Sequence, residues 1–251
     1  MPEPTTPVFE VFSGIQGEGI LVGTRQVFVR FCGCNRRCFY CDTQEVMAPV
    51  QACAIEQAPG SREFAEHRNP MTPAAVARAA AALDAPRGLH DSVALTGGEP
   101  LIHADFLTAL CPLLAQHGLP VYLETNGTLP EALERVLDGV QHVAMDIKLK
   151  SATGQATPWE AHYRFLSLAL RRSAQVKVVV AAETTEEELT RVAELVGTQR
   201  AQAPVVLQPV TAVRGIQPPT PLQLLQFQAL LKASLRDVRV IPQVHRLMGQ
   251  K

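Results

Sequence analysis

Cys32-Gly33-Cys34-Asn35-Arg36-Arg37-Cys38-Phe39-Tyr40-Cys41-Asp42-Thr43 is the stretch that holds four of the six cysteines of this 251-residue chain. Cys34, Cys38 and Cys41 are separated by three residues and then by two. Three thiolates in one short loop can hold three corners of a metal cluster, whereas iron–sulfur clusters are normally held by four. The spacing therefore predicts a cluster with one position open for another ligand, much as a catalytic zinc keeps an open position.

The same cysteines are also compatible with a structural zinc site. Sites of four cysteines, or of three cysteines and a histidine, are common for zinc, and Cys32 or a distant histidine would complete one here. Cys32 lies only two residues before Cys34, which is an unfavourable spacing for two ligands of one metal. We therefore expect Cys32 to be a small residue at a strand end, and Cys53 and Cys111 to be ordinary thiols.

The composition is that of an ordinary globular enzyme. Hydrophobic residues make up 47% and charged residues 19%, which allows a sizeable core. The net charge of −1 provides no field that would recruit nucleic acid or an anionic membrane. No apolar run reaches the roughly 18 residues needed to span a bilayer, and the polar N-terminus lacks the apolar segment of a signal peptide. We expect a cytoplasmic protein, in which clustered cysteines are more often metal ligands than disulfides.

Segments with strand and helix patterns alternate about six times after residue 70. This alternation predicts an α/β fold with a parallel sheet, right-handed crossovers and a single domain over residues 1–251. A barrel-like sheet is expected, and a doubly wound sheet is the alternative, because alternation does not distinguish them. Residues 13–19 are glycine-rich and expected to be flexible. Glu45 to Asn69 lacks periodicity, so a long, variable loop or lid is expected near residues 45–70.

Polar residues and glycines follow several of the predicted strands. Ligands of parallel α/β sheets bind beyond the carboxyl ends of the strands. Gly97 and Gly98 would let the backbone approach a ligand closely, and the carboxylate of Glu99 suits a cationic amino group. Arg30 and Lys148 are cations at strand ends, suited to a carboxylated substrate. The alternatives without a ligand-binding role are a plain turn at the glycines and ion-paired or solvated charges at the two cations.

Together these residues resemble the radical S-adenosylmethionine superfamily. The resemblance rests on Cys34-x3-Cys38-x2-Cys41, the aromatic before the last cysteine, and Gly97-Gly98-Glu99-Pro100. Further segments make the chain similar to the 7-carboxy-7-deazaguanine synthase family from about Val8 to the C-terminal tail: Gln16-Gly17-Glu18-Gly19, Asp42-Thr43, Glu124-Thr125-Asn126-Gly127-Thr128 and Gln208-Pro209. The chain departs from that family at Asp146-Ile147-Lys148, where a Ser-Pro-Lys run is expected.

The resemblance implies a partial (β/α)6-type barrel and a set of ligand-binding residues. Cys34, Cys38 and Cys41 would hold a 4Fe–4S cluster whose open iron binds S-adenosylmethionine. The implied cofactor contacts are Tyr40, Gly97, Gly98, Glu99, Thr125, Asn126, Asp146, Lys148 and Gln208. The implied substrate contacts are Gln16, Gly17, Glu18, Arg30, Gly98 and His245, although a lone histidine near a terminus is more often structural. Thr43 would give an oxygen ligand to Mg²⁺, an ion that prefers oxygen donors.

The implied activity is that of a carbon–nitrogen lyase in queuosine and 7-deazapurine biosynthesis. A 5′-deoxyadenosyl radical would take a hydrogen atom from C6 of 6-carboxy-5,6,7,8-tetrahydropterin and later return it, giving 7-carboxy-7-deazaguanine and ammonia. The implied partners are an external electron donor such as flavodoxin or ferredoxin and a second copy of the chain in a homodimer, with no nucleic acid and no membrane. Two alternatives stay open: an activase of a glycyl-radical enzyme and a non-enzymatic zinc-binding module.

Overall fold

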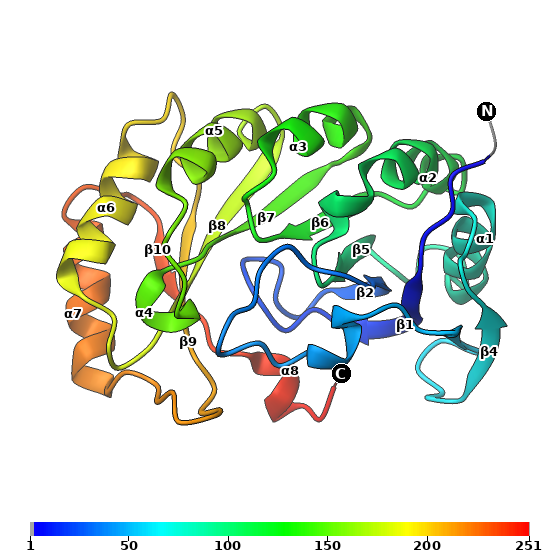
Figure 1. Ribbon diagram of the computed structural model, residues 1–251, viewed down its shortest axis with the longest axis horizontal. Coiled ribbons are helices and arrows are strands. Elements are labelled where there is room, and N and C mark those ends of the chain that lie inside the picture. Colours follow the sequence, from blue (N-terminus) through cyan, green and yellow to red (C-terminus); the bar gives the residue numbers. More distant parts are fainter. Residues whose placement is uncertain (1–2, 251) are drawn as a thin grey trace.

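The computed structural model describes residues 3–250, which form an α/β fold on one ten-stranded sheet (Figure 1). The strand order is β10-β9-β8-β7-β6-β5-β2-β1-β3-β4. The parallel part comprises β5 (Ser92–Gly97), β6 (Val121–Thr125), β7 (His142–Ile147), β8 (Ser173–Val180), β9 (Val205–Pro209) and β10 (Val238–Val240). Because the order does not reverse within this part, the sheet is not doubly wound. The prediction of a mostly parallel, barrel-like but open sheet is confirmed.

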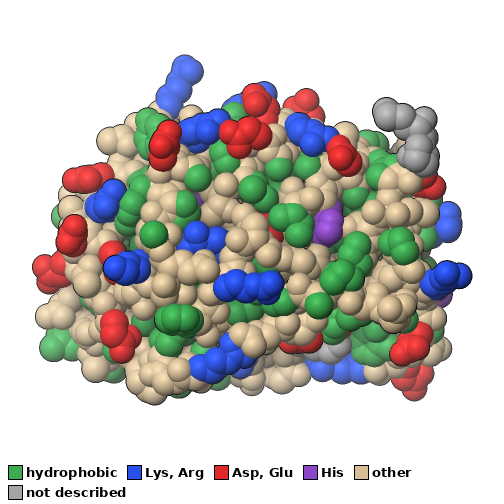
Figure 2. All heavy atoms as spheres, viewed as in Figure 1, with side chains coloured by type: hydrophobic (Ala, Val, Ile, Leu, Met, Phe, Trp, Pro, Cys, Tyr) green, Lys and Arg blue, Asp and Glu red, His purple; other side chains and the backbone are tan. Residues whose placement is uncertain are grey.

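Six helices cover the outer face of the sheet (Figure 1). They are α1 (Pro73–Leu83), α2 (Ala104–Gln116), α3 (Pro130–Val136), α5 (Trp159–Ala169), α6 (Glu186–Gly197) and α7 (Pro221–Lys232). Thr72, Thr185 and Thr220 each cap a helix by accepting a hydrogen bond from a backbone N–H of its first turn, as N-cap threonines do. Figure 2 shows Asp and Glu side chains mainly around the edge of this view. No helix among residues 3–250 is long and apolar enough to cross a membrane.

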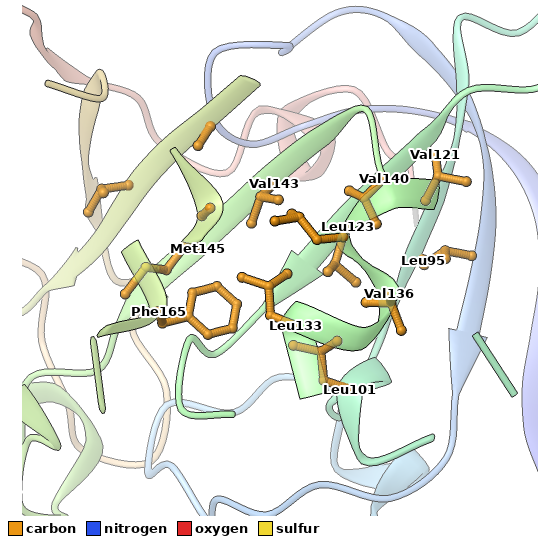
Figure 3. Close-up of a cluster of buried hydrophobic side chains, with 14 of the residues drawn as sticks. Leu95, Leu101, Val121, Leu123, Leu133, Val136, Val140, Val143, Met145 and Phe165 are labelled. Atoms are coloured by element: carbon orange, nitrogen blue, oxygen red, sulfur yellow. The ribbon is translucent and has the colours of Figure 1, made fainter. Parts of the chain in front are cut away.

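The hydrophobic core lies between the helices and the sheet. Leu95, Leu123 and Val143 of successive strands point from the sheet towards Leu133 of α3 and Phe165 of α5 (Figure 3). These five side chains are fully buried. Burial of a large apolar side chain contributes about 1.5–3 kcal/mol, so this layer fixes the strands from outside and leaves their other face available for a site.

The concave face of the sheet has two layers of side chains. The apolar floor, as we call it, is one packed cluster formed by Phe12, Phe28, Ala94, Tyr122 and Ala144. Side chains two residues apart along a strand point to the same face. The residues two positions nearer the open end of each strand therefore point to the same face. Together with Lys177 of β8 we call them the polar rim: Glu10, Arg30, Thr96, Glu124 and Asp146. The sheet thus presents charged groups above an apolar base.

The structure corrects two expectations near the N-terminus. Instead of a long loop, residues 45–69 contain a short 3-10 turn, η1 (Gln44–Met47), and an antiparallel hairpin of β3 (Ala52–Glu56) and β4 (Phe64–Arg68) at one sheet edge. Residues 13–15, expected to be flexible, end β1 (Val8–Ile15), which pairs antiparallel with β2 (Arg25–Phe31). Glu56 stabilises this region because its carboxylate accepts hydrogen bonds from the backbone N–H groups of Ser13, Gly60 and Arg62.

Candidate active site

A cavity of about 550 Å³ lies at the carboxyl ends of the strands, above the polar rim. Its wall comes from the cysteine loop, the strand ends, the loop after β1 and the C-terminal segment. It contains all of the predicted site residues except Glu99: Gln16, Gly17, Glu18, Arg30, Cys34, Cys38, Tyr40, Cys41, Thr43, Gly97, Gly98, Thr125, Asn126, Asp146, Lys148, Gln208 and His245. The fold therefore brings together residues that the sequence distributes over more than 200 positions.

Cys34, Cys38 and Cys41 line one wall of this cavity as free thiols. Cys32 is only 1% exposed and does not belong to the wall, so it is a neighbour of the three cysteines, as expected. No group of three or more His, Cys, Asp or Glu side chains in residues 3–250 is placed to hold a single metal ion. Three thiols along one wall are compatible with a metal cluster that keeps one position open.

Burial is the main influence on the thiols of Cys34 and Cys38, and it raises the pKa of each. The cation of Lys148 acts in the opposite direction on both. Metal ligation requires thiolates, so binding of a cationic metal cluster here would release protons.

Gly97 and Gly98 are required by the approach of the cysteine loop to the end of β5. Gly97 has φ +124°, and a β-carbon there would lie 2.5 Å from the backbone nitrogen of Phe31. A β-carbon on Gly98 would lie 2.6 Å from the carbonyl carbon of Gly33 and overlap its oxygen. Both glycines also line the cavity. They allow a close backbone approach, as predicted, but the group they approach in the structure is the cysteine loop itself.

Glu99 is fully buried and holds the end of β6. Its carboxylate accepts hydrogen bonds from Leu101 N (3.0 Å), Thr125 Oγ1 (2.8 Å) and Asn126 N (2.7 Å). Burial raises the pKa of Glu99 to about 7 against the opposing effect of these hydrogen bonds. Asn126 in turn places its amide nitrogen 3.9 Å from Cys34 Sγ. Direct contact of Glu99 with a cofactor stays a prediction; in this structure the carboxylate positions residues that line the cavity.

Two lysines and two carboxylates form a partly buried charge network across the cavity. Lys148 Nζ contacts Asp146 Oδ2 at 2.6 Å and donates to the hydroxyl oxygen of Tyr40 at 2.9 Å. Lys177 Nζ contacts Asp146 Oδ1 at 3.3 Å and also pairs with Glu18. Burial alone would raise the pKa of Asp146, but the two lysines hold it below its ordinary value. Burial likewise tends to raise the pKa of Glu18, but Lys177 holds it below its ordinary value. Both carboxylates are therefore charged at neutral pH.

The C-terminal segment covers one side of the cavity. Gln243 Nε2 donates to Glu18 (2.9 Å) and to Asp42 (3.1 Å), and Arg246 pairs with Asp42 at 2.9 Å. Thr43 Oγ1 donates to the other oxygen of Asp42 at 3.0 Å. Burial tends to raise the pKa of Asp42, but these hydrogen bonds lower it to about 2. The loop that carries the cysteines is thus tied to the C-terminal segment.

The remaining predicted residues are held from several directions. Gln16 donates to Glu124 at 2.8 Å, and Arg30 pairs with Glu10 at 2.8 Å. A β-carbon on Gly17 would lie 2.5 Å from the backbone nitrogen of His245, so this glycine admits the C-terminal helix α8 (Val244–Leu247). Gln208 is buried, and its Oε1 has no hydrogen-bond partner among residues 3–250 although the residue lines the cavity. An orphaned buried acceptor at a cavity wall suits a ligand that brings a donor.

Sequence reasoning missed Lys177 as a site residue. It lies in the strand Gln175-Val176-Lys177-Val178-Val179-Val180, where Val176, Val178 and Val180 point into the core. A charged residue between buried valines must face the opposite side of the sheet, so this alternation was an available signal. Glu124 was noted only as part of a turn, yet it lines the cavity and accepts a hydrogen bond from Thr96 at 2.7 Å.

An open, mostly parallel α/β sheet with a three-cysteine loop at the carboxyl ends of its strands is typical of the radical S-adenosylmethionine class. The family model described as "Radical SAM superfamily" matches residues 28–152. A 7-carboxy-7-deazaguanine synthase of Geobacter sulfurreducens is 44% identical over all of this chain and all of that protein. One of Methanothermobacter thermautotrophicus is 35% identical over 97% of each chain. This chain belongs to the 7-carboxy-7-deazaguanine synthase family.

Solved structures show the same fold. QueE from Escherichia coli matches with a TM-score of 0.60 and 21% identity, over 96% of this chain and 95% of that chain. A domain of a pyruvate-formate lyase-activating enzyme from Bacteroides vulgatus matches with a TM-score of 0.50 and 17% identity, over 59% of this chain and 98% of that chain. The fold is therefore shared with an activase, while the full-length relatives above are named for the synthase.

Proposed function

We propose that this protein converts 6-carboxy-5,6,7,8-tetrahydropterin to 7-carboxy-7-deazaguanine with loss of ammonia. One observation carries the proposal: a single cavity is lined both by the three cysteines and by polar side chains that could bind a substrate. The chain also matches synthases over its whole length. Radical SAM membership implies a 4Fe–4S cluster and S-adenosylmethionine. When bound, they supply the one-electron chemistry, and the protein supplies binding, orientation and electrostatics.

The cysteine side of the cavity would hold the cofactors. Cys34, Cys38 and Cys41 would bind the cluster as thiolates. Tyr40, whose ring is covered by the Lys148 cation at 5.3 Å, offers an aromatic face with a fixed orientation. Gln208 offers its unpartnered carbonyl oxygen to a donor such as an amino group. Asn126 is held by Glu99 beside Cys34 and would line the bound cofactor.

The opposite side would hold the pterin. Arg30 suits the substrate carboxylate, because a guanidinium can bind a carboxylate with two parallel hydrogen bonds. Glu18 suits N–H donors of the pterin ring, and Lys177 keeps this carboxylate charged. His245 and Gln243 would exclude water from this side. We further propose Mg²⁺ beside Thr43 and Asp42, since that ion takes oxygen ligands and commonly shares them with an anionic substrate group.

An anaerobic assay tests the proposal. The reconstituted protein should bind roughly three to four irons per chain and form 7-carboxy-7-deazaguanine, detected by mass spectrometry, from the pterin, S-adenosylmethionine and a reductant. Chelation of Mg²⁺ and the Thr43→Ala variant should both reduce the rate, whereas Cys111→Ser, which changes a buried thiol outside the cavity, should retain iron. A loaded protein that makes no deazaguanine would refute the substrate assignment.

The same preparation separates the alternatives. Deoxyadenosine formed only with a partner polypeptide would indicate an activase, and one zinc without sulfide would indicate a zinc-binding module. Sedimentation of the purified protein tests the proposed homodimer. A flavodoxin or ferredoxin as electron donor, and a cytoplasmic location, stay predictions.

A further inference from the structure

Gln175 is a buried amide that connects three parts of the active-site cavity. The residue is 1% exposed, lies in β8 two positions before Lys177, and lines the cavity from the concave face of the sheet. Its side chain carries an acceptor oxygen and a donor nitrogen. Gln175 Oε1 accepts a hydrogen bond from the backbone N–H of Ile20 at 2.6 Å, and Nε2 donates to the hydroxyl oxygen of Tyr122 at 2.9 Å. One side chain thus joins β8 and the apolar floor to the loop between β1 and β2.

The loop between β1 and β2, residues 16–24, carries Glu18, which is one of the proposed pterin contacts. The base of the loop is closed by its own backbone. Gln16 N donates to the carbonyl oxygen of Thr24, and Gly23 N donates to that of Gln16, both at 2.8 Å. These two bonds fix the ends of the loop, whereas Glu18 lies at its tip. The position of the tip therefore depends also on contacts from outside the loop.

Two glycines let this tip fit between β8 and the C-terminal segment. Gly19 has φ +69°, and a β-carbon there would lie 2.8 Å from Cδ of Gln175. Gly17, on the other side of Glu18, lies against the backbone of α8, and its carbonyl oxygen accepts a hydrogen bond from Val244 N at 2.9 Å. Glycine at both positions therefore removes the side chains that would push the tip away from its two supports.

Strand β8 holds the tip at two points, through two side chains of one face. Gln175 bonds to the backbone of Ile20, while Lys177 pairs with the carboxylate of Glu18. β8 is an interior strand that pairs with both β7 and β9, so it is a rigid base for these side chains. Lys177 attracts only the end of a side chain with several rotatable bonds. Gln175 bonds to the main chain, and it thereby fixes the backbone from which the Glu18 side chain projects.

Gln175 is itself held in one orientation. The ring of Tyr122 stacks on that of His142, with the ring centroids 5.0 Å apart and the planes parallel. Burial raises the pKa of Tyr122 well above its ordinary value, so its hydroxyl stays neutral and can accept the hydrogen bond from Gln175 Nε2. This bond directs Oε1 towards the N–H of Ile20. Rotation of the amide would leave buried polar groups unpaired, which is costly.

We propose that Gln175 is a positioning residue for the pterin, which fixes the loop tip so that the Glu18 carboxylate faces the substrate. The inference rests on the proposed function, because Glu18 is a proposed substrate contact. Both hydrogen-bond partners of Gln175 are protein groups, so it acts on the substrate through Glu18. Hydrogen bonds weaken steeply when distance and angle depart from their preferred values, so a displaced tip would hold the N–H donors of the pterin ring less well.

The kinetic test uses Gln175→Met, which keeps the length of the side chain and removes both hydrogen bonds. In the reconstituted protein, the KM for 6-carboxy-5,6,7,8-tetrahydropterin should rise about tenfold, the effect of losing a hydrogen-bonded contact, with little change in kcat. Such a split indicates weaker binding of the ring, whereas general damage to the fold would lower kcat as well. Iron content and the dissociation constant of S-adenosylmethionine should equal the wild-type values, because neither hydrogen bond of Gln175 reaches the cysteine loop.

Hydrogen–deuterium exchange tests the loop without any substrate. Peptides that cover residues 16–24 should exchange faster in Gln175→Met, since the N–H of Ile20 loses its acceptor. Gln175→Glu retains an acceptor for this N–H, and Tyr122 can donate to its other oxygen. Its KM and exchange should therefore be closer to the wild-type values.

Two further variants complete the comparison. Gln141→Met is the matched control, because Gln141 Oε1 also accepts a hydrogen bond from a backbone N–H, that of Val121 at 2.6 Å, but lies outside the cavity. It should leave the KM and the exchange of residues 16–24 unchanged. Gly19→Ala displaces the same tip from the loop side and should also raise the KM, so it replaces Gln175→Met if that variant binds less iron.

The outcomes separate this proposal from the proposed function. A wild-type KM in Gln175→Met, or in Gly19→Ala where it replaces that variant, would overturn the role of Gln175, even if the loop exchanged faster. A loss confined to kcat would overturn it too. If the wild-type protein forms no deazaguanine, the substrate assignment fails by itself, and unchanged exchange of residues 16–24 in Gln175→Met would then still overturn the positioning of the loop.

Discussion

Gly98 and Gly33 are in direct backbone contact, so the end of β5 and the beginning of the cysteine loop cannot move apart independently. A β-carbon on Gly98 would overlap the carbonyl oxygen of Gly33, which is backbone and cannot turn away as a flexible side chain would. The loop that carries the three cysteines is therefore positioned by a strand more than 60 residues further along the chain.

We expect Gly98→Ala to displace the cysteine loop. The variant should lose most of its iron after reconstitution and about 1–3 kcal/mol of unfolding free energy, the usual cost of overpacking. Iron analysis and denaturant unfolding measure the two effects. Gly197→Ala is the matched control, because the nearest atom to its added carbon is 3.7 Å away. Wild-type iron content in Gly98→Ala would show that the loop adapts to the added carbon.

Arg36 should make the cluster easier to reduce. It lines the cavity, its backbone N–H donates to Cys34 Sγ at 3.4 Å, and its Nε is buried without a partner among residues 3–250. Reduction adds negative charge, which a nearby cation stabilises in a site of low dielectric. Arg36→Gln should therefore shift the reduction potential to more negative values in a redox titration followed by electron paramagnetic resonance. Arg37→Gln, an exposed neighbour, should produce a smaller shift; equal shifts would contradict this role for Arg36.

Lys177 should be critical for the partly buried charge network of Glu18, Asp146 and Lys148. Lys177→Met removes the cation that Glu18 and Asp146 share, although Asp146 keeps its pair with Lys148. Because these side chains are only partly buried, the cost should be below the roughly 3–5 kcal/mol of a fully buried pair, at about 1.5–3 kcal/mol. Denaturant unfolding should show a loss of this order. Lys232→Met, at the exposed end of α7, should have little effect. Adding Glu18→Gln to Lys177→Met should recover part of the stability, and the absence of any recovery would show that the two residues are not coupled.

Glu99 should make stability depend on pH. Burial raises its pKa from an ordinary 4.5 to about 7, so the folded protein holds this proton more tightly than the unfolded chain. Its contribution to the free energy of unfolding is complete below pH 4.5 and is lost as the pH rises through about 7. The loss amounts to about 3 kcal/mol. Unfolding of Glu99→Gln should lack this decrease, whereas the exposed Glu134→Gln should retain it. A wild-type pH dependence in Glu99→Gln would contradict the assignment.

The sequence was sufficient to predict the cavity wall because the fold is regular. Parallel strands bring their carboxyl ends to one edge of the sheet, so polar residues after each strand had to meet. This reasoning placed Asn126, Asp146 and Gln208 in one wall with the cysteines, and the structure shows them there. The family resemblance added Gln16 and Glu18, which the alternation of strands and helices could not have placed.

Other features depended on contacts that have no local signal. The β3–β4 hairpin is short and lies at an edge, where alternation is weak. Glu56 bonds not only to the nearby Gly60 and Arg62 but also to the backbone of Ser13, 43 residues earlier. Glu99 follows two glycines, and no local pattern indicated that its carboxylate would accept hydrogen bonds from Thr125 and Asn126. The position of the C-terminal segment results from Asp42 and Glu18, far earlier in the chain.

The apolar floor has an uneven depth. Phe12, Phe28 and Tyr122 are large, whereas Ala94 and Ala144 are small, and of these five Phe28, Tyr122 and Ala144 line the cavity. Because these side chains face away from the core, each can change size without forcing the helices on the other side to repack. Phe28, Tyr122 and Ala144 therefore set the depth of the cavity on this side. Replacing Ala144 by a larger residue would make the cavity shallower and leave the cysteine side unchanged.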